Sequence, residues 1–194
     1  MPSRPVLVVT GPSGAGKGTL IKGLLDRVDG LEVAVSATTR PQRPGEVDGR
    51  DYWFLSDEEF TRRVAEGDFL EWVEYVSGRR YGTLGSEIER IARDGAVCVL
   101  ELELEGALRV QRDVADSTTI FIAADVDELE RRLRERATES TGEIGERIAL
   151  AHSQLERAHE FRYMVRNDEL ERATAALAAL VECELARAGT ISRR

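Results

Sequence analysis

The sequence predicts an α/β fold, in which a mostly parallel sheet is flanked by helices on both faces. Short apolar segments alternate with amphipathic segments along most of the chain, and a glycine-rich loop joins the first apolar segment to the first helix. Two stretches, roughly 37–84 and 136–147, interrupt this alternation. Because ligands of such sheets bind beyond the carboxyl ends of the strands, we expect functional residues in these two stretches.

The composition predicts one soluble domain. The chain has 194 residues, of which 42% are hydrophobic and 32% charged, with a formal net charge of −9. This acidic balance argues against nucleic acid as a partner, since nucleic-acid surfaces are basic. The apolar runs at 6–9 and 96–100 are too short for a membrane span, and the N-terminus is too short in apolar residues for a signal peptide. Cys98 and Cys183 lack CxxC spacing, so we expect reduced thiols in a cytoplasmic protein.

The first half of the chain predicts strand, helix and strand, followed by the first interruption. The expected elements are strands at 5–11, 31–36 and 69–76, helices at 17–28 and 56–67, and a turn at 78–85. Ser56 and Glu59 have the spacing of a capping box, in which each side chain satisfies a backbone N–H at the start of a helix. Residues 37–55 are rich in Pro, Gly, Arg and Thr and carry no periodic pattern.

The second half resumes the alternation. The expected elements are helices at 86–95, 105–114, 125–136, 144–161 and 168–187, and strands at 96–104, 117–124 and 162–165. Asp125 is the expected N-cap of its helix, and the polar stretch 137–143 separates two helices. His152, Glu156 and His159 share one helical face, where a metal site is the alternative to the favoured interpretation, a solvated surface.

The segment TGPSGAGKGTL (10–20) contains a phosphate-binding loop of the P-loop NTPase type. Gly11 and Gly16 have the required spacing, Lys17 follows, and the loop lies between an expected strand and an expected helix. Glycines permit the tight backbone turn, so that N–H groups and the helix N-terminus face the phosphates. The hydroxyl usual directly after the lysine is replaced by Gly18, and Thr19 is the next hydroxyl.

A second anion site is expected in SATTRPQRPGEVDGRDYWF (36–54). Three arginines, several hydroxyls and aromatic rings gather there in a net acidic chain. Guanidinium groups bind phosphate oxygens in pairs, and tyrosine hydroxyls add directed donors. This chemistry favours a phosphate group as the ligand over the alternative, a solvated arginine loop.

Several motifs in one order resemble the guanylate kinase family over nearly the whole chain: GPSGAGKGT, SATTRPQRPGEVDGRDYWF, FLEW, RYGT, the strand before EGA, RRLRER with Arg147, and VRND. The resemblance implies ATP-dependent phosphorylation of GMP, and of dGMP, to the diphosphate for GTP supply. It implies a P-loop core at 1–36 and 85–194, a lid at about 132–147 and a small mixed α+β GMP-binding insert at 37–84. Mg²⁺ would enter with ATP, and homo-oligomers are compatible with the family.

The resemblance also assigns residue roles. ATP-binding residues are Gly11, Pro12, Ser13, Gly14, Ala15, Gly16, Lys17, Gly18, Thr19 and Asn167. GMP-binding residues are Ser36, Arg40, Arg43, Tyr52, Glu71, Tyr81, Thr83, Glu101 and Glu103. Catalytic cations are Lys17, Arg43, Arg132, Arg136 and Arg147. No protein side chain is expected to bind Mg²⁺ directly; Thr19 or Glu101 would act through water.

Guanine chemistry agrees with these assignments. Guanine presents N1–H and N2–H₂ as donors and O6 as an acceptor, so its pocket needs a carboxylate, here Glu71 or Glu103, and hydroxyls such as Thr83 and Ser36. Adenine lacks N1–H and would leave the carboxylate unpaired, which rejects it strongly. The acceptor phosphate is largely dianionic near neutral pH, with a second pKa of about 6, and needs no general base.

The chain departs from the family pattern in three places. It has LELE, with Glu101 and Glu103, where LDID is usual, so each carboxylate reaches one methylene further. Glu105 stands where glutamine is common. RERA replaces RGRG at the end of the first lid helix, and the loss of two glycines stiffens that edge.

Two other functions resemble this one in sequence. Ribose 1,5-bisphosphate kinases share the P-loop and core but lack the guanine-facing set, so Glu71 with RYGT favours GMP. Non-catalytic guanylate-kinase-like modules of scaffold proteins bind phosphopeptides and have a degraded P-loop. The intact loop with Lys17 favours an enzyme.

Overall fold

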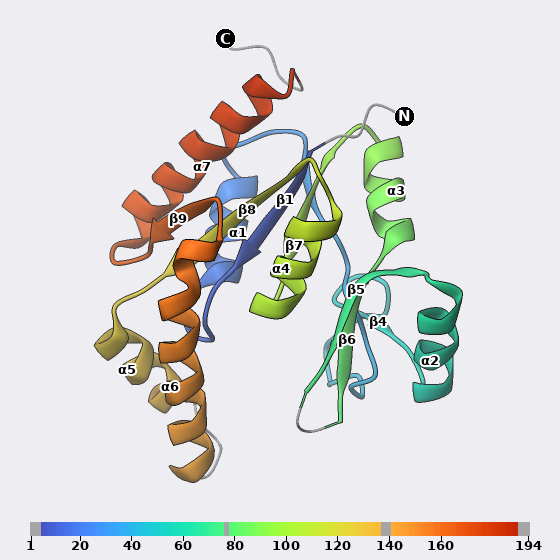
Figure 1. Ribbon diagram of the computed structural model, residues 1–194, viewed down its shortest axis with the longest axis horizontal. Helices are drawn as coiled ribbons and strands as arrows, with labels where there is room; N and C mark the ends of the chain where they lie inside the picture. Colours follow the sequence, from blue (N-terminus) through green and yellow to red (C-terminus); the bar gives the residue numbers. More distant parts are fainter. Residues whose placement is uncertain (1–4, 76–77, 137–140, 190–194) are drawn as a thin grey trace.

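The computed structural model describes residues 5–75, 78–136 and 141–189. Its core is a five-stranded sheet in the order β2-β7-β1-β8-β9, in which all neighbouring strands are parallel (Figure 1). The strands are β1 (Val6–Thr10), β2 (Leu31–Val33), β7 (Val97–Glu101), β8 (Ser117–Ala123) and β9 (Tyr163–Arg166). The predicted parallel α/β class is therefore confirmed.

Helices cover both faces of this sheet. On one face lie α1 (Lys17–Leu25) and α7 (Leu170–Arg187), and on the other lie α3 (Gly85–Arg93) and α4 (Leu104–Asp113). Alternate residues of β1 enter the two cores: Leu7 and Val9 pack with α1 and α7, whereas Val6 and Val8 pack with α3 and α4. Burial on both faces explains why this strand is continuously apolar.

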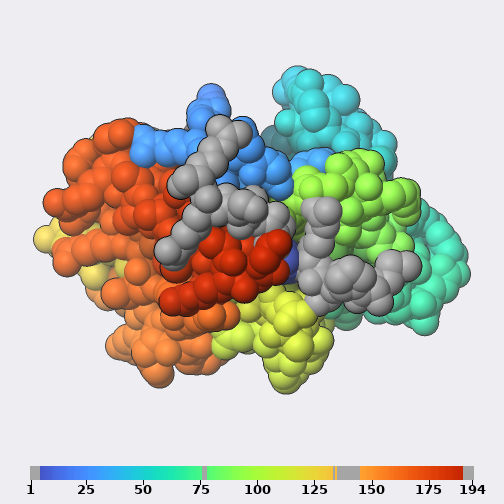
Figure 2. Space-filling view, turned by 90° about the horizontal axis from the view of Figure 1, so that it is seen from above, coloured from blue at the N-terminus to red at the C-terminus, as the bar shows by residue number. Residues whose placement is uncertain are grey.

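A second sheet lies beside the core, in the order β4-β3-β6-β5. It contains β3 (Ala37–Thr38), β4 (Trp53–Phe54), β5 (Phe69–Glu74) and β6 (Arg80–Leu84), with parallel and antiparallel pairs, and α2 (Asp57–Glu66) packs on it. Figure 2 shows these cyan and green segments on one side of the molecule, opposite the orange and red segments of α6, β9 and α7. The expected mixed insertion is thus present as a second mixed sheet.

The turn expected at 78–85 is wrong, because Arg80–Leu84 forms the strand β6. Its Arg-Tyr-Gly-Thr pattern resembles a turn locally, but Tyr81 and Gly82 pair with β3 on one side and β5 on the other. The strand expected at 31–36 ends at Val33, since the Val35 N–H donates to the Glu87 carboxylate of α3 at 3.1 Å. The strand expected at 96–104 ends at Glu101, because Glu103 is the N-cap of α4.

Two predicted caps are present. Ser56 Oγ accepts the Glu59 N–H at 3.1 Å, and Asp125 Oδ1 accepts the Asp127 N–H at 3.1 Å. The carboxylate of Glu59, expected to reach back, accepts hydrogen bonds from Arg62 and Arg63.

Helices α5 (Val126–Arg136) and α6 (Thr141–Glu156) follow the core strand β8, and a 3-10 helix, η1 (Arg157–Glu160), ends the segment. A single helix over 144–161 was expected. The change at Arg157 turns the chain so that Phe161 enters the core, where its ring lies 5.4 Å from that of Phe121. In the described part of the chain, no helix is long and apolar enough to cross a membrane.

Candidate functional site

The glycine-rich loop joins β1 to α1 at the carboxyl edge of the core sheet. Gly11, Gly14 and Gly16 have φ values of 141°, 87° and 85°, which a residue with a side chain rarely adopts. A Cβ on Gly11 would also lie 2.3 Å from the Ile122 carbonyl oxygen of β8. The first turn of α1 contains no acidic residue, and its N-cap, Gly16, has no side chain. The helix N-terminus therefore presents uncapped N–H groups to an anion.

Lys17 lies over this loop. Its ammonium donates to the carbonyl oxygens of Gly11 at 2.7 Å and Pro12 at 3.4 Å. Because these neutral acceptors are weaker partners than phosphate oxygens, an incoming polyphosphate would draw the ammonium toward itself.

Asn167, which follows β9, braces the loop from the core side. Its side chain is buried, and its amide nitrogen donates to the Ala15 carbonyl at 2.8 Å. A Cβ on Gly16 would lie 2.6 Å from that nitrogen, so the loop glycine is needed for this contact. In the structure, Asn167 contacts the backbone of the glycine-rich loop. Its contact with ATP stays a prediction from the sequence.

Two of the three lid arginines meet the same loop. Arg132 of α5 donates to the Gly14 carbonyl at 3.1 Å and to Glu128 at 2.7 Å, and Arg147 of α6 donates to Ser13 Oγ at 3.0 Å. The third, Arg136, ends α5, but its side chain lies outside the described part of the structure. The loop is therefore approached by cations from α1, α5 and α6.

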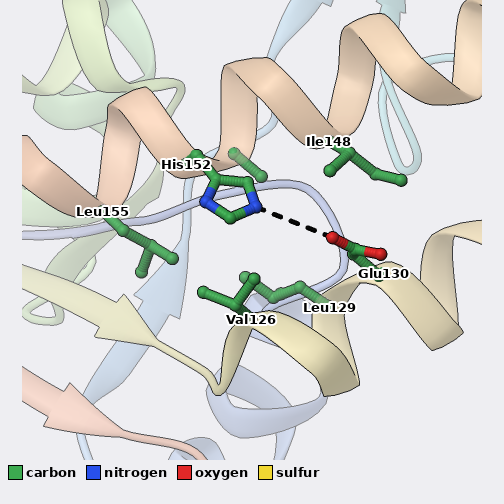
Figure 3. Close-up of a pocket in the computed structure, with 7 residues that line it drawn as sticks. Val126, Leu129, Glu130, Ile148, His152 and Leu155 are labelled. Atoms are coloured by element: carbon green, nitrogen blue, oxygen red, sulfur yellow. Dashed lines mark ion pairs between the residues drawn. The ribbon is translucent and has the colours of Figure 1, made fainter.

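An apolar seam holds α5 and α6 together (Figure 3). It is lined by Val126, Leu129, Ile148, Ala151 and Leu155, with an ion-pair contact of 3.7 Å between His152 Nε2 and Glu130 at its edge. The seam leaves no room for a water molecule, so it is helix packing rather than a substrate pocket. His159 does not take part in that contact; its Nδ1 forms a hydrogen bond with the Glu156 carbonyl oxygen at 2.8 Å. Among the described residues, no group of three His, Cys, Asp or Glu side chains is arranged to hold a metal ion.

Arg40 is the central residue of the segment in which the sequence predicts a second anion site. Only 5% of its surface is exposed, and its guanidinium lies 5.2 Å from the centre of the Tyr52 ring and donates to Glu46 at 2.7 Å. The hydrogen bond to Glu46 raises the pKa of Arg40, although burial opposes it. Tyr81 lies 6.1 Å from Tyr52, ring centre to ring centre. The structure thus brings together Arg40, Tyr52 and Tyr81, as the sequence predicted.

Arg43 lies close to this cluster but at the surface. Its backbone N–H donates to the second oxygen of Glu46 at 2.8 Å. Glu46, which was not expected at the site from the sequence, binds both the Arg40 side chain and the Arg43 backbone. Its position as an acid between Arg43 and Arg50 was the available signal.

Glu71 and Thr83 face each other on β5 and β6. The Thr83 hydroxyl donates to Glu71 Oε1 at 2.8 Å, and both side chains are buried. Burial raises the pKa of Glu71, while Thr83 and Arg109 oppose the shift. A buried carboxylate held by a single hydroxyl keeps an oxygen with acceptor capacity for a ligand. Ser36 precedes β3, where its carbonyl accepts the Trp53 N–H at 2.9 Å.

Glu101 and Glu103 follow β7 and lie between the two anion sites. The Glu101 residue is exposed, but the protein around its carboxylate displaces water. This desolvation raises the pKa of Glu101, while the Lys17 charge opposes the shift. A Cβ on Gly18 would lie 3.6 Å from Glu101 Oε2, so the carboxylate stands over the first turn of α1. Tyr75, which directly follows β5, lies near Glu103: burial raises the pKa of this tyrosine, and the negative charge of Glu103 raises it further. The sequence analysis did not identify Tyr75.

The donor set beside the loop fits a magnesium ion. Glu101 offers carboxylate oxygens next to the loop, and the exposed Thr19 offers a hydroxyl on the same turn of α1. Hard oxygen ligands and a partly retained water shell are what Mg²⁺ prefers when it binds with phosphates.

Comparisons with known proteins agree on one family. A family model described as guanylate kinase matches residues 3–184. A guanylate kinase of Rubrobacter xylanophilus is 50% identical over 169 residues, covering 87% of this chain and 88% of the relative. One from Synechococcus elongatus is 45% identical, covering 91% and 96%. A crystal structure of guanylate kinase from Anaplasma phagocytophilum has a TM-score of 0.74 at 25% identity, covering 93% of this chain and 86% of that one.

Proposed function

The chain belongs to the guanylate kinase family, and from that premise we propose that it transfers the terminal phosphoryl group of ATP to GMP at the edge of the core sheet. The observation that carries this proposal is that Glu101 lies close to two groups of residues suited to anions, since its charge interacts with both Lys17 and Tyr52. One is the glycine loop with Lys17, and the other is the cluster of Arg40, Tyr52 and Tyr81.

The donor side of the reaction is assigned to the loop. The N–H groups of 11–19 would hold the β and γ phosphates of ATP, and Lys17 would leave its two carbonyl partners to neutralise them. Arg132 and Arg147 already reach the loop from α5 and α6, so closure of these helices would add positive charge around the transferred group. Asn167 would keep the loop backbone in place from beneath.

The acceptor side is assigned to the second sheet. Arg40, Arg43, Tyr52 and Tyr81 would clamp the phosphate of GMP, because guanidinium forks and phenol hydroxyls match its oxygens. Glu71, Thr83, Glu103 and Ser36 would surround the base. The Glu71 carboxylate would accept from N1–H and N2–H₂ of guanine, whereas adenine would leave it unpaired.

Catalysis would then rest on positioning and charge. The GMP phosphate is a dianion that attacks without a general base, so the chain must align two polyanions and offset their repulsion. Lys17 and the arginines supply that charge. Glu101, with Thr19, would hold Mg²⁺ through water, and the ion would supply positive charge beside the ATP phosphates.

Three finer predictions go with this function. We expect dGMP to be accepted, since none of the assigned contacts involves the 2′-hydroxyl of the sugar. The cytoplasmic location and the absence of nucleic-acid partners stay predictions from the composition.

The donor-side assignment is tested with Lys17→Ala. Loss of a charged group that stabilises the transition state should lower kcat by about 100-fold or more, while the protein stays folded. The matched control is Lys22→Ala, on the exposed face of the same helix, which should keep kcat within about 2-fold. Equal activities of the two variants in a coupled ADP-release assay would refute the role of Lys17.

A further inference from the structure

We propose that Gly106 of α4 is a specificity-determining positioning residue. Because glycine has no side chain, it leaves space for the Glu71 carboxylate to align with the base. This proposal rests on the role of Glu71 in base recognition given above. It concerns a residue of the core helix that acts on the second sheet and that is not itself expected to touch the nucleotide.

The contact is close and involves one partner. A Cβ placed on Gly106 would lie 2.6 Å from Glu71 Oε2, 3.2 Å from its Cδ and 3.7 Å from its Cγ. The three nearest atoms thus all belong to one side chain. The other carboxylate oxygen, Oε1, accepts the Thr83 hydroxyl at 2.8 Å. Glu71 is therefore held between a hydroxyl of β6 and the bare backbone of α4.

Other helical glycines in the chain have different surroundings. A Cβ on Gly23 of α1 would meet Thr174 of α7 at 2.7 Å, so that glycine permits two helices to pack. A Cβ on Gly145 of α6 would meet no atom within 4 Å. At Gly106 the obstacle is the far end of a flexible side chain, which can move. A methyl group there would displace the Glu71 carboxylate and leave the helix in place.

The displacement would have a direction. The methyl would push Oε2 away from α4 and break the alignment that the Thr83 hydroxyl maintains on Oε1. Guanine needs both oxygens of a carboxylate to pair with N1–H and N2–H₂, so a turned carboxylate would lose one of the two pairs. Gly106 is the third residue of α4, and its closeness to the Glu71 carboxylate accounts for the absence of a side chain there.

The test uses Gly106→Ala, Glu71→Ala and the double variant in steady-state kinetics with GMP and ATP. We expect Gly106→Ala to raise the KM for GMP by about 10-fold or more, to change the KM for ATP by less than about 2-fold, and to change kcat little. Inosine monophosphate, which lacks N2–H₂, provides the specificity readout: the ratio of kcat/KM for GMP over this nucleotide should fall by a similar factor. Arg112→Ala, at an exposed position of the same helix α4, is the control and should leave all these values unchanged.

The double variant shows whether Gly106 acts through Glu71. Glu71→Ala removes the carboxylate and makes room for the methyl, so adding Gly106→Ala should cause no further change in the KM for GMP. A further increase in the KM for GMP, from Glu71→Ala to the double variant, would mean that Gly106 acts through another residue. This comparison tests the proposal even if Gly106→Ala alone is unstable. If Glu71→Ala raises the KM and Gly106→Ala does not, this proposal is wrong and the proposed function stands. If Glu71→Ala itself leaves the KM unchanged, the assigned role of Glu71 fails first.

Discussion

At the scale of single residues, the site contains two nearly buried ionisable side chains whose hydrogen-bond partners differ in charge. Arg40, 5% exposed, is paired with Glu46 and lies against the Tyr52 ring. Glu71, 4% exposed, has a neutral hydroxyl as its nearest partner. Arg40 has an ionic partner at hydrogen-bond distance, whereas Thr83 and the charge of Arg109 offset the burial of Glu71 only in part, so this carboxylate retains part of its desolvation cost. Glu71 is therefore the residue that gains most from a ligand with two donors.

This cost predicts a pH-dependent effect of Glu71→Gln on the unliganded protein. Because burial raises the folded-state pKa of Glu71, the folded chain binds more protons than the unfolded chain above the unfolded pKa of about 4.3. The stability that the protonated carboxyl contributes is fully present below that pH and is lost as the pH rises through the folded pKa. The glutamine variant, which cannot ionise, should therefore be more stable than the wild type near pH 7.5, and by less near about pH 5.

The measurement is urea unfolding at several pH values. Glu89→Gln, at an exposed position of α3, is the control for the loss of one negative charge. A gain in stability that is equal at both ends of the pH range, or a loss near neutral pH, would show that the Glu71 carboxylate is not the destabilised group described above.

At the scale of elements, the apolar seam is what holds α5 and α6 against each other. Leu129 is 2% exposed in that seam (Figure 3), whereas Leu150, on α6, is 56% exposed. We expect Leu129→Ala to lower the free energy of unfolding by about 2–5 kcal/mol, and Leu150→Ala to change it by less than about 0.5 kcal/mol. Denaturant unfolding of the two variants would measure the difference, and similar losses for both would mean that the seam does not hold the helices.

Elements were predictable from the sequence where local pattern decides them. The buried strand, the glycine loop and the helix that follows lie at β1 and α1 as expected, and the caps at Ser56 and Asp125 are present. The strand β6 was not predictable, because its residues resemble a turn and one of its two partners, β3, is distant in sequence. Non-local pairing of this kind leaves no local signal.

At the scale of the whole molecule, the same distinction separates residue types from contacts. The site residues could be named from motifs in the sequence. The contacts that hold these residues in place could not be predicted in that way. Asn167 contacts Ala15 across 152 residues, and Arg147 contacts Ser13 across 134. The contact of Gly106 with Glu71 joins the core to the second sheet. Such pairs follow from the topology, in which the ends of β1, β7, β8 and β9 meet at one edge of the sheet (Figure 1).

The central claim, that the two anion sites serve ATP and GMP together, is tested most directly by an acceptor panel. The intact protein is mixed with Mg·ATP and, in separate reactions, with GMP, dGMP, AMP, CMP, UMP or ribose 1,5-bisphosphate, and ADP release is measured. We expect turnover with GMP and dGMP, and rates with the other acceptors that are lower by about 100-fold or more. Turnover with ribose 1,5-bisphosphate but not GMP, or no turnover with any acceptor by a protein that binds ATP, would contradict the claim.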